Sequence, residues 1–388
     1  MTTHDLNVLR PAWARIDLDA LSRNLERLRA AVAPARVTAV VKADAYGHGA
    51  VDTARALERS AVDCLAVAMP EEGIELRRAG IRAPILVLGV HLPPQIPLLV
   101  DADLLPTIST HTQLAAWSRR SGHQPQPIHL KVDTGMNRLG FSLEQLPGVL
   151  DEIRRSSRLE LVGLVSHFAA ANDPPAASNT LQEERWREIE ALLTPEEGQQ
   201  VVRHLANSAA ALHRPSSRLD SVRSGLALYG LDPAGRLSSL EPVMSVHARI
   251  VELRQVASGD GVGYNHRWRA RRDSRVGILP LGYADGYQWR LGGRAQALAA
   301  GHRVDVVGAI SMDMTAVDLT DSELREGDQV TLLGSCGNAS ISALELAEWA
   351  GTIPYEVLVS FGLRLPRLYV QDGAEPVLSG RLVAGLPA

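Results

Sequence analysis

The sequence has few of the features that mark secreted, membrane-bound or nucleic-acid-binding proteins. Its 388 residues include two cysteines, Cys64 and Cys336, so we expect a reduced cytoplasmic chain rather than a disulfide scaffold. It contains no uninterrupted apolar run of about 18 residues, so no membrane-spanning helix is expected. The N-terminal segment MTTHDLNVLRPAW has no apolar core typical of a signal peptide. With 40 basic and 44 acidic residues, the chain also lacks the positive charge that nucleic acids attract.

The rest of the composition is that of a folded globular protein. Hydrophobic residues make up 45% of the chain and charged residues 22%, which provides enough apolar surface for a sizeable core. The first part of the chain alternates runs of β-branched residues with segments of helical periodicity. Eight runs are predicted strands: Val37–Lys42, Cys64–Ala68, Ile85–Leu88, Leu104–Ile108, Ile128–Val132, Leu161–Ser166, Val202–Leu205 and Leu219–Arg223. The predicted helices are Leu18–Ala30, Glu71–Ala79, Ser142–Arg155 and Asn179–Leu193.

Eight strand–helix repeats favour an α/β fold with a (β/α)8 TIM-like barrel, which we assign to residues 13–242. An open doubly wound sheet would give the same alternation. The weakest point is the fourth helix, because the stretch after Leu88 is rich in proline.

From Val243 onward the pattern changes to an alternation with a period of two residues, which indicates β-strands. Further strands are predicted at Val276–Leu279, Val304–Val307, Thr315–Asp318 and Gln329–Leu333, with one helix at Ile341–Trp349. We therefore assign residues 1–12 plus 243–388 to a C-terminal mainly-β domain.

Polar residues that suit catalysis follow the predicted barrel strands. In barrels of this kind the functional groups lie at the C-terminal ends of the strands. Those positions hold Lys42, Lys131, His167, Asn207–Ser208 and Arg223. Near the last two strands, where barrels commonly bind phosphate, the hydroxyl of Ser208 and the N–H groups of Gly225 and Leu226 suit an anion.

Lys42 is a candidate nucleophile. A lysine at a strand end is most often solvated, but Lys42 is followed by Tyr46-Gly47-His48-Gly49, a turn where backbone can approach a ligand closely. In an apolar pocket a lysine amine loses its proton and can attack a carbonyl group. These features suit pyridoxal 5'-phosphate (PLP), whose aldehyde would react with Lys42 and whose phosphate would need the donors described above.

Eight motifs, in order along the chain, resemble those of the alanine racemase family. The first, AVVKADAYGHG at residues 39–49, is similar to the family's signature around the PLP lysine. The others are KVDTGMNRLG (131–140), SHFA (166–169), NSA (207–209), RSGL (223–226) with YG (229–230), GYADGY (282–287), SMD (311–313) and IPYE (353–356). The resemblance covers both predicted domains. It implies a PLP-dependent alanine racemase that interconverts L- and D-alanine, supplies D-alanine for peptidoglycan and forms a homodimer with shared active sites.

The resemblance also implies a role for each motif residue. The two catalytic bases would be Lys42, which binds PLP covalently, and Tyr264 of the Gly-Val-Gly-Tyr segment. The remaining cofactor contacts would be Tyr46, His167, Asn207, Ser208, Arg223 at the pyridine nitrogen, Gly225, Leu226 and Tyr355. Arg138 and the backbone N–H of Met312 would hold the substrate carboxylate, and Lys131, carbamylated in some members, would position Arg138. Tyr283 and Asp313 would lie at the entrance, and the partner subunit would supply Tyr264 and Met312.

The chemistry of these roles is coherent. Racemisation needs one proton removed from one face of Cα and another delivered to the opposite face, which calls for two opposed bases. A tyrosine can serve as one of them where cationic neighbours lower its pKa. An arginine at the pyridine nitrogen stays charged and donates, so the ring nitrogen remains unprotonated and side reactions such as transamination are suppressed.

Other interpretations remain open. In its glycine-rich turn Tyr264 could simply pack, and Lys131 could pair with a carboxylate. Many relatives carry an arginine and a cysteine shortly before the Met-Asp pair, where this chain reads Gly308-Ala309-Ile310-Ser311. A wider entrance would admit serine or lysine, so a broader-specificity racemase is the main alternative. A PLP-dependent decarboxylase of the same architecture should lack Arg223 and Tyr264, and PLP-binding homeostasis proteins lack the second domain.

Overall fold

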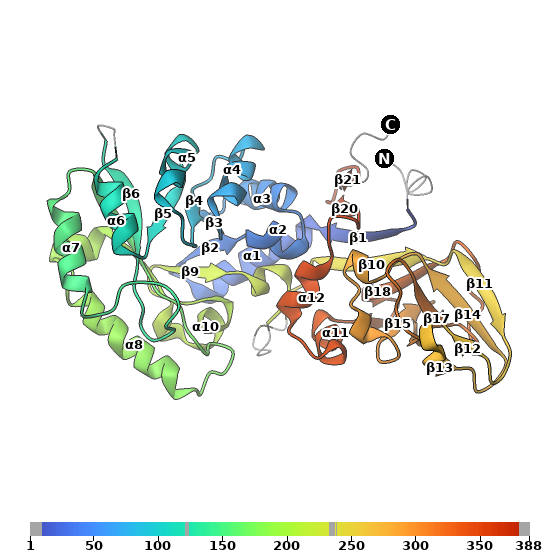
Figure 1. The fold of residues 1–388 in the computed structure, drawn as a ribbon. Coiled ribbons are helices and arrows are strands. Elements are labelled where there is room, and N and C mark those ends of the chain that lie inside the picture. Colours follow the sequence, from blue (N-terminus) through green and yellow to red (C-terminus); the bar gives the residue numbers. More distant parts are fainter. Residues whose placement is uncertain (1–9, 121–123, 233–236, 238, 380–388) are drawn as a thin grey trace. The chain divides into compact units, whose positions relative to one another are not determined.

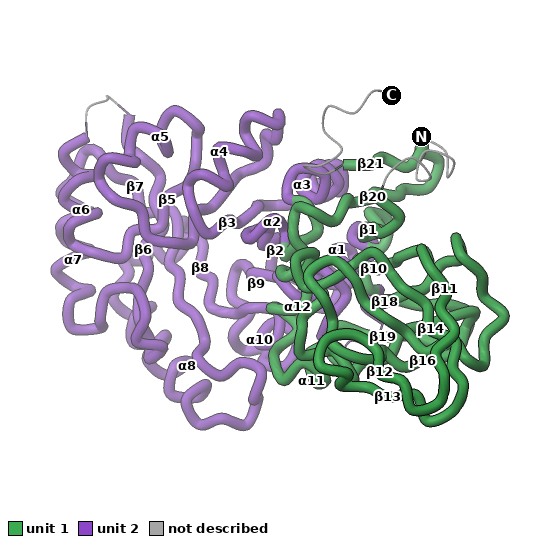
Figure 2. Tube along the Cα trace, turned by 45° about the vertical axis from the view of Figure 1, so that its right-hand side comes forward, with its two compact units in different colours: residues 1–20, 46–49, 242–388 green, residues 21–45, 50–241 purple. Residues whose placement is uncertain are grey.

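The computed structural model describes residues 10–120, 124–232, 237 and 239–379 (Figure 1). The chain divides into two compact units (Figure 2). The barrel unit comprises residues 21–45 and 50–241, and the β unit comprises residues 1–20, 46–49 and 242–388. Residues 13–20, which the sequence analysis placed with the barrel, group with the β unit because β1 (Ala12–Asp17) pairs with two of its strands. Residues 1–9 and 380–388 of the predicted mainly-β domain lie outside the described residues.

The core of the barrel unit is a sheet of eight parallel strands whose spatial order follows the chain. The first strand pairs with the last, and the ring is left open only between the seventh and the eighth, where a single bridge joins Asn207 to Arg223. All eight predicted strands are confirmed, and the nearly closed ring decides for the barrel over the open sheet. The strands are β2 (Arg36–Val40), β3 (Cys64–Val67), β4 (Ile85–Val87), β5 (Leu105–Ile108), β6 (Gln126–Lys131), β7 (Leu159–Val165), β8 (Val202–His204) and β9 (Ser221–Ser224).

Helices alternate with these strands along the chain. They are α1 (Leu18–Val32), α2 (Lys42–Gly47), α3 (Ala50–Arg59), α4 (Pro70–Arg78), α5 (Ile96–Asp101), α6 (His111–Ser118), α7 (Leu146–Arg155), α8 (Ala177–Glu190), α9 (Pro195–Gln200) and α10 (Ser208–His213). In α1, Leu21, Leu25 and Leu28 are fully buried, as their spacing on one helix face predicts. The stretch after Leu88, whose prolines made it the weakest point of the prediction, contains a helix of six residues, α5.

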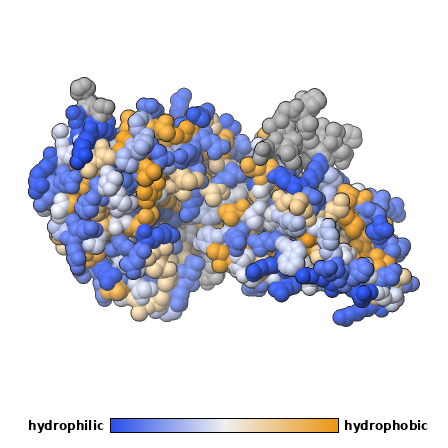
Figure 3. Space-filling view, viewed as in Figure 1, coloured by the Kyte–Doolittle hydropathy of each residue, from blue (hydrophilic) through white to orange (hydrophobic). Residues whose placement is uncertain are grey.

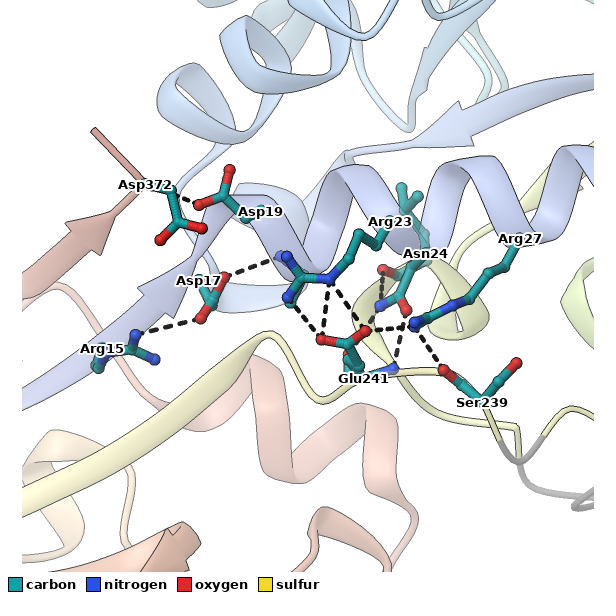
Figure 4. A network of polar contacts seen from close by, with 11 residues as sticks. Arg15, Asp17, Asp19, Arg23, Asn24, Arg27, Ser239, Glu241 and Asp372 are labelled. Atoms are coloured by element: carbon teal, nitrogen blue, oxygen red, sulfur yellow. Dashed lines mark hydrogen bonds and ion pairs between the residues drawn. The ribbon is translucent and has the colours of Figure 1, made fainter. Parts of the chain in front are cut away.

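A polar network fastens the end of the barrel unit to α1 (Figure 4). The Glu241 carboxylate accepts hydrogen bonds from Arg23 and pairs with Arg27 at 2.6 Å. The Asn24 amide donates to the Glu241 carbonyl at 2.7 Å and accepts the Glu241 N–H at 2.8 Å. Hydrogen bonds from Arg23 hold the pKa of Glu241 at about 2. Because Asn24 also reaches the Leu228 carbonyl, α1 fixes the segment that follows β9.

In its described residues the β unit is built on a sheet of eleven strands and a separate two-stranded ribbon. After β1 its strands are β10 (Met244–Arg249), β11 (Glu252–Val256), β12 (Gly261–Val262), β13 (Trp268–Arg269), β14 (Ser274–Leu279), β15 (Gln296–Ala299), β16 (His302–Val307), β17 (Thr315–Asp318), β18 (Gln329–Cys336), β19 (Ala339–Ile341), β20 (Arg367–Val370) and β21 (Val377–Ser379). Its helices are α11 (Ala343–Ala350) and α12 (Pro354–Ser360). The mainly-β prediction is confirmed.

Two details of the sequence prediction were wrong. Lys42 does not end a strand: β2 stops at Val40, and Lys42 is the first residue of α2. The described part of the β unit has two helices where one was predicted, since Pro354, a proline suited to the first position of a helix, begins α12. The remaining elements differ from prediction by a few residues at their ends.

Within the described residues, no helix combines the length and the apolar character needed to cross a membrane. Figure 3 shows hydrophilic residues over much of the visible face of each unit, with apolar residues among them.

Candidate functional site

The element α2, which follows β2 and begins at Lys42, is a turn of left-handed helix. Ala43, Asp44, Ala45 and Tyr46 all have φ between 52° and 55°. In this region each non-glycine residue is strained by about 1–2 kcal/mol relative to the right-handed conformation. Such strain persists only where the surroundings hold it, and it concentrates at functional sites. Lys42 is therefore directly followed by a strained backbone segment that the surrounding fold holds in place.

The carboxylate of Glu72 holds this turn from α4. Its Oε1 accepts the N–H of Ala43 at 2.7 Å, and its Oε2 accepts the N–H groups of Ala68 and Met69 at 2.7 and 3.0 Å. Asp44 adds a second clamp, since its Oδ1 accepts the N–H of Ala50 at 2.7 Å. The first residue after Lys42 is thus fixed by a side chain of a neighbouring helix.

The amine of Lys42 lies in an environment that favours its neutral form. Burial lowers its pKa most, Arg138 and Arg223 lower it further, and the Glu72 carboxylate opposes them. A second amine, Lys131 at the end of β6, has its pKa lowered to about 7, first by burial and then by Arg223 and Arg138. Two lysines and two arginines thus share one end of the barrel, and a neutral lysine amine is the nucleophilic form.

Arg138 lies on a loop shaped by Asp133. The Oδ1 atom of Asp133 accepts the N–H groups of Gly135, Met136 and Asn137 at 2.9 to 3.1 Å. Asn137 has a φ of 56°, which asparagine tolerates better than most residues. The side chain of Arg138 is exposed beyond this turn, so it is available to an anionic group.

Arg223 on β9 is buried, and its hydrogen bonds go to uncharged acceptors. Its Nη1 donates to the Nδ1 and carbonyl of His204 at 2.9 and 2.7 Å. Its Nη2 donates to the carbonyls of Ser166 and Leu205 and to Nδ1 of His167, at 2.6, 3.0 and 3.1 Å. Burial and the nearby Arg223 hold the pKa of His167 well below its usual value, so this imidazole is neutral. These uncharged acceptors hold the guanidinium of Arg223 in place without forming an ion pair with it.

The start of α10 and the segment after β9 form a set of donors. Asn207 caps α10 by accepting the N–H of Ala210 at 3.0 Å. The Ser208 hydroxyl oxygen accepts the N–H groups of Gly225 and Ala227 at 2.9 and 3.3 Å, which leaves its own proton to be donated. Leu226 is the first residue of a 3₁₀ turn, so its N–H has no acceptor inside that turn.

In the β unit, Tyr46 and Tyr355 lie together, with ring centroids 6.1 Å apart. Burial raises the pKa of Tyr46, so its hydroxyl keeps the proton and can donate it. The neighbouring Gly47 carbonyl accepts Nε and Nη2 of the buried Arg367 at 3.2 and 2.9 Å. A Cβ on Gly47 would lie 2.4 Å from the Leu358 carbonyl oxygen, so the turn at this point requires glycine.

The other β-unit candidates are displayed on its surface. Tyr264 begins a 3₁₀ turn and is 69% exposed, and Met312 is 52% exposed. Backbone bonds at 3.0 Å tie Tyr283 to Ser311 and Ala284 to Met312, so two of the motifs form one structural element. Asp313 pairs with Arg364 at 2.6 Å.

The structure therefore brings Lys42, Lys131, Arg138, His167, Asn207, Ser208, Arg223, Gly225 and Leu226 to the C-terminal end of the barrel strands. Sequence reasoning missed four residues that support them: Glu72, His129, Gln182 and His204. The Gln182 amide donates to Thr134 Oγ1 and the His167 carbonyl at 3.0 and 2.8 Å, which links the Arg138 loop to the end of β7. Gln182 is buried, but it stands beside charged residues of α8, so the local sequence gives no sign of its role.

The residues at the barrel end fit a phosphorylated pyridine aldehyde. An amine with a lowered pKa suits the aldehyde, an uncompensated buried guanidinium suits a ring nitrogen that accepts, and the free Ser208 proton with the Leu226 N–H suits a phosphate. PLP contains all three groups.

Comparison with protein families gives two matches that together span most of the chain. Residues 16–233 match the family "Alanine racemase, N-terminal domain", and residues 243–369 match "Alanine racemase, C-terminal domain". Curated alanine racemases from Nostoc sp. and Sorangium cellulosum are each 42% identical to this chain. The alignments cover 92% of this chain and 96% of the Nostoc protein, and 93% of this chain and 99% of the Sorangium protein.

Solved structures agree with these matches. An alanine racemase from Clostridium difficile 630 superposes with a TM-score of 0.89 at 32% identity, covering 96% of this chain and 99% of that one. A Bacillus anthracis alanine racemase with bound L-Ala-P gives a TM-score of 0.88 at 33% identity, covering 97% and 99%. A Bartonella henselae alanine racemase with covalently bound pyridoxal phosphate gives 0.85 at 30% identity, covering 93% and 100%.

Proposed function

The chain belongs to the alanine racemase family, and we propose that it interconverts L-alanine and D-alanine with PLP bound to Lys42. The observation that carries the proposal is the set of four basic groups at the barrel end, in which the pKa values of Lys42 and Lys131 are lowered by burial and by Arg138 and Arg223. It supplies a nucleophilic amine beside guanidinium groups for an anionic substrate and for a ring nitrogen.

In the proposed site the barrel residues bind and orient. The amine of Lys42 holds the cofactor, and the Ser208 hydroxyl and the Leu226 N–H, with the hydroxyls of Tyr46 and Tyr355, receive its phosphate. Gly225 lies beside them, with its N–H bonded to the Ser208 oxygen. His167 offers a flat, neutral imidazole to the cofactor ring, beside the capping residue Asn207. Arg223 donates to the ring nitrogen and keeps its charge. Arg138 and the N–H of Met312 hold the substrate carboxylate, with Lys131 beside Arg138.

The proton moves between two opposed bases. When bound, PLP withdraws electrons from the substrate Cα–H bond, which makes this proton removable. Nζ of Lys42 takes or returns the proton on one face of Cα, and Oη of Tyr264 does so on the other. Because the two groups lie on opposite faces of Cα, the two directions of the reaction use them in opposite order.

The exposure of Tyr264 supports the proposal that the active chain is a homodimer with shared sites. Large apolar side chains of the β unit are exposed at Tyr264, Met312, Ile353 and Leu363. Exposed apolar side chains in the same unit as a candidate base suit a surface that a partner covers. In the dimer, Tyr264 and Met312 of one subunit would complete the other's site, with Tyr283 and Asp313 at its entrance.

A cytoplasmic racemase of this kind would supply D-alanine for peptidoglycan. The two cysteines are free, in keeping with a reducing compartment. The segment Gly308-Ala309-Ile310-Ser311 keeps a broader-specificity racemase as the second candidate, because the alanine at position 309 leaves room where many relatives carry arginine.

The test is turnover of each enantiomer of alanine, serine and lysine by purified protein with added PLP, followed by chiral chromatography. We expect both alanine enantiomers to reach the same equilibrium mixture, and Lys42→Ala to lose both the absorption band of bound cofactor and the activity. Faster turnover of serine or lysine would favour the broader racemase. Release of CO2 without racemisation would favour the decarboxylase and exclude the proposal.

A further inference from the structure

We propose that His129 and His204 form a pair of neutral imidazoles whose fixed proton positions orient Arg223. Both would be positioning residues, acting through Arg223 rather than on the substrate. The inference rests on the proposed function for its consequence, but the proton positions themselves follow from the geometry of the barrel.

The hydrogen bonds define one proton arrangement. Nη1 of Arg223 lies 2.9 Å from Nδ1 of His204, and Nε2 of His204 lies 2.8 Å from Nδ1 of His129. A guanidinium can only donate, so Nδ1 of His204 must accept. A neutral imidazole carries a single proton, which in His204 is then on Nε2 and is donated to His129. The proton of His129 must in turn be on its Nε2.

Both imidazoles are held in the neutral form. His129 is 8% exposed and His204 is 1% exposed. Burial, with Arg223 nearby, lowers the pKa of His129 to about 4 and that of His204 well below its usual value. A carboxylate in place of His204 would neutralise Arg223 by forming an ion pair. A neutral nitrogen fixes the guanidinium and leaves its charge available to a ring nitrogen.

The strand between the two histidines is adapted to this contact. His129 lies on β6 and His204 on β8, and Gly163 of the intervening β7 pairs with His129. A Cβ on Gly163 would lie 2.3 Å from Nδ1 of His129, so no larger residue fits without moving the ring. Glycine weakens the interior of a strand, so its presence here indicates that another group needs the space. The two rings meet edge to face, with centroids 5.0 Å apart.

The arrangement predicts what the loss of His129 does. Without an acceptor for its Nε2–H, His204 sits buried with an unpaired donor, so its ring is no longer held from the side opposite Arg223 and can turn toward another acceptor. Once the ring turns, the guanidinium loses the only imidazole acceptor of its Nη1 atom among the described residues. Arg223 would then be held by backbone carbonyls and His167 alone, and its direction toward the ring nitrogen would be less defined.

The test compares His129→Asn with His129→Leu in the PLP-loaded enzyme. The asparagine Oδ1 occupies the place of the histidine Nδ1 and accepts a hydrogen bond, whereas leucine fills the space without accepting. The first readout is the ratio of transamination, in which alanine and PLP yield pyruvate and pyridoxamine phosphate, to racemisation. We expect His129→Leu to raise this ratio by about tenfold, a change of about 1.4 kcal/mol in relative barriers, and His129→Asn to stay within about twofold of the parent.

The second readout is independent of activity. In cofactor-free protein labelled with [15N]histidine, His204 should show a protonated, hydrogen-bonded Nε2 in the parent and in His129→Asn. In His129→Leu its Nδ1 signal should show loss of the hydrogen bond from Arg223. If His129→Leu does not fold, Gly163→Ala is the substitute variant, because its added Cβ displaces the His129 ring. An unchanged ratio and an unchanged His204 Nδ1 signal in His129→Leu, or equal changes in both variants, would overturn the inference. A parent enzyme that fails to racemise alanine would instead overturn the proposed function, and the tautomers would still be read.

Discussion

Glu72 lies against the peptide that follows Lys42, with its Oε1 2.7 Å from the amide nitrogen of Ala43. It is the one carboxylate among the groups that set the pKa of Lys42, and it raises that pKa against burial and Arg138. Glu72→Gln removes the negative charge, so we expect the pKa of Lys42 to fall further. Arg138→Leu removes a positive charge and should raise it.

The pKa of Lys42 can be measured directly, because Lys42 and Lys131 are the only lysines of the chain. In cofactor-free protein labelled at the lysine ε-carbon, each amine gives one signal, and Lys131→Met assigns them. Glu71→Gln, one residue away on α4, is the matched control and should leave both titrations in place. A Lys42 midpoint that rises in Glu72→Gln would contradict the electrostatic account.

Arg223 sets how the proposed reaction divides between racemisation and transamination. Replacing it by Glu puts a group that can protonate the ring nitrogen where a permanent donor stood. We expect racemisation to fall by a factor on the order of 10²–10³, as when one preorganised donor is lost, while transamination falls less or rises. Pyruvate release per racemisation event measures the partition. An unchanged ratio in Arg223→Glu would refute the role of the guanidinium, and Arg223→Lys, which keeps the charge, is the control.

Tyr264→Phe tests the second base. The hydroxyl is the only group removed, and the side chain is exposed in the single chain, so folding should not suffer. We expect cofactor absorbance to be retained and racemisation to fall by about 10²- to 10⁴-fold, the usual contribution of a positioned acid–base group. Exchange of the alanine Cα proton with solvent should continue through Lys42 from one enantiomer. Full racemisation by this variant would remove the two-base mechanism.

The left-handed turn after Lys42 predicts opposite effects of two substitutions at one position. Ala43 has a φ of 52°, where glycine is unstrained and a β-branched residue is a severe outlier. Ala43→Gly should leave the melting temperature within a few degrees of the parent, because relieved strain offsets the added freedom of the unfolded chain. Ala43→Val should lower stability by at least about 1–2 kcal/mol and weaken PLP binding. Equal stability of the two variants in thermal unfolding would show that the turn is not left-handed.

The sequence predicts the barrel well because its signals are local. Several strands, such as β2 and β4, are short runs of buried apolar residues, and the strand ends carry the polar groups that the barrel architecture assigns to the site. Motifs such as KVDTGMNRLG contain both the candidate Arg138 and the turn that presents it, since Asp133 bonds the next N–H groups itself.

The parts that were missed depend on contacts distant in the sequence. Lys42 follows five strand-like residues, and no local pattern indicates four consecutive left-handed residues held by Glu72 from another helix. His129 and His204 are 75 positions apart, and each alone reads as an ordinary strand residue. One global signal was available, however. The chain has 40 basic residues, of which two are lysines, so a lysine marks a place where an amine that can lose its proton is needed.

Lys131 makes stability depend on pH in a defined direction. Its pKa is about 7 in the fold, lowered by burial and by Arg223, whereas an unfolded chain gives a lysine pKa of about 10.4. Between these values the unfolded chain binds a proton that the folded chain does not, so the free energy of unfolding rises with pH from about 7 to about 10. Below about pH 7 both states are protonated, and the burial penalty is present in full. Lys131→Met has a similar volume and no charge, so it should be more stable than the parent at pH 6.5, with the difference shrinking toward pH 9.5.

Urea unfolding of cofactor-free protein in CO2-free buffer measures this difference, because a carbamate on Lys131 would abolish the titration. Restoring bicarbonate supplies the control: if the neutral amine takes up CO2, as the resemblance implies, the parent should gain stability that Lys131→Met does not. Parallel pH profiles for the two proteins would show that Lys131 keeps its proton in the fold. It would then be paired with a carboxylate such as Asp133, whose charge opposes the shift.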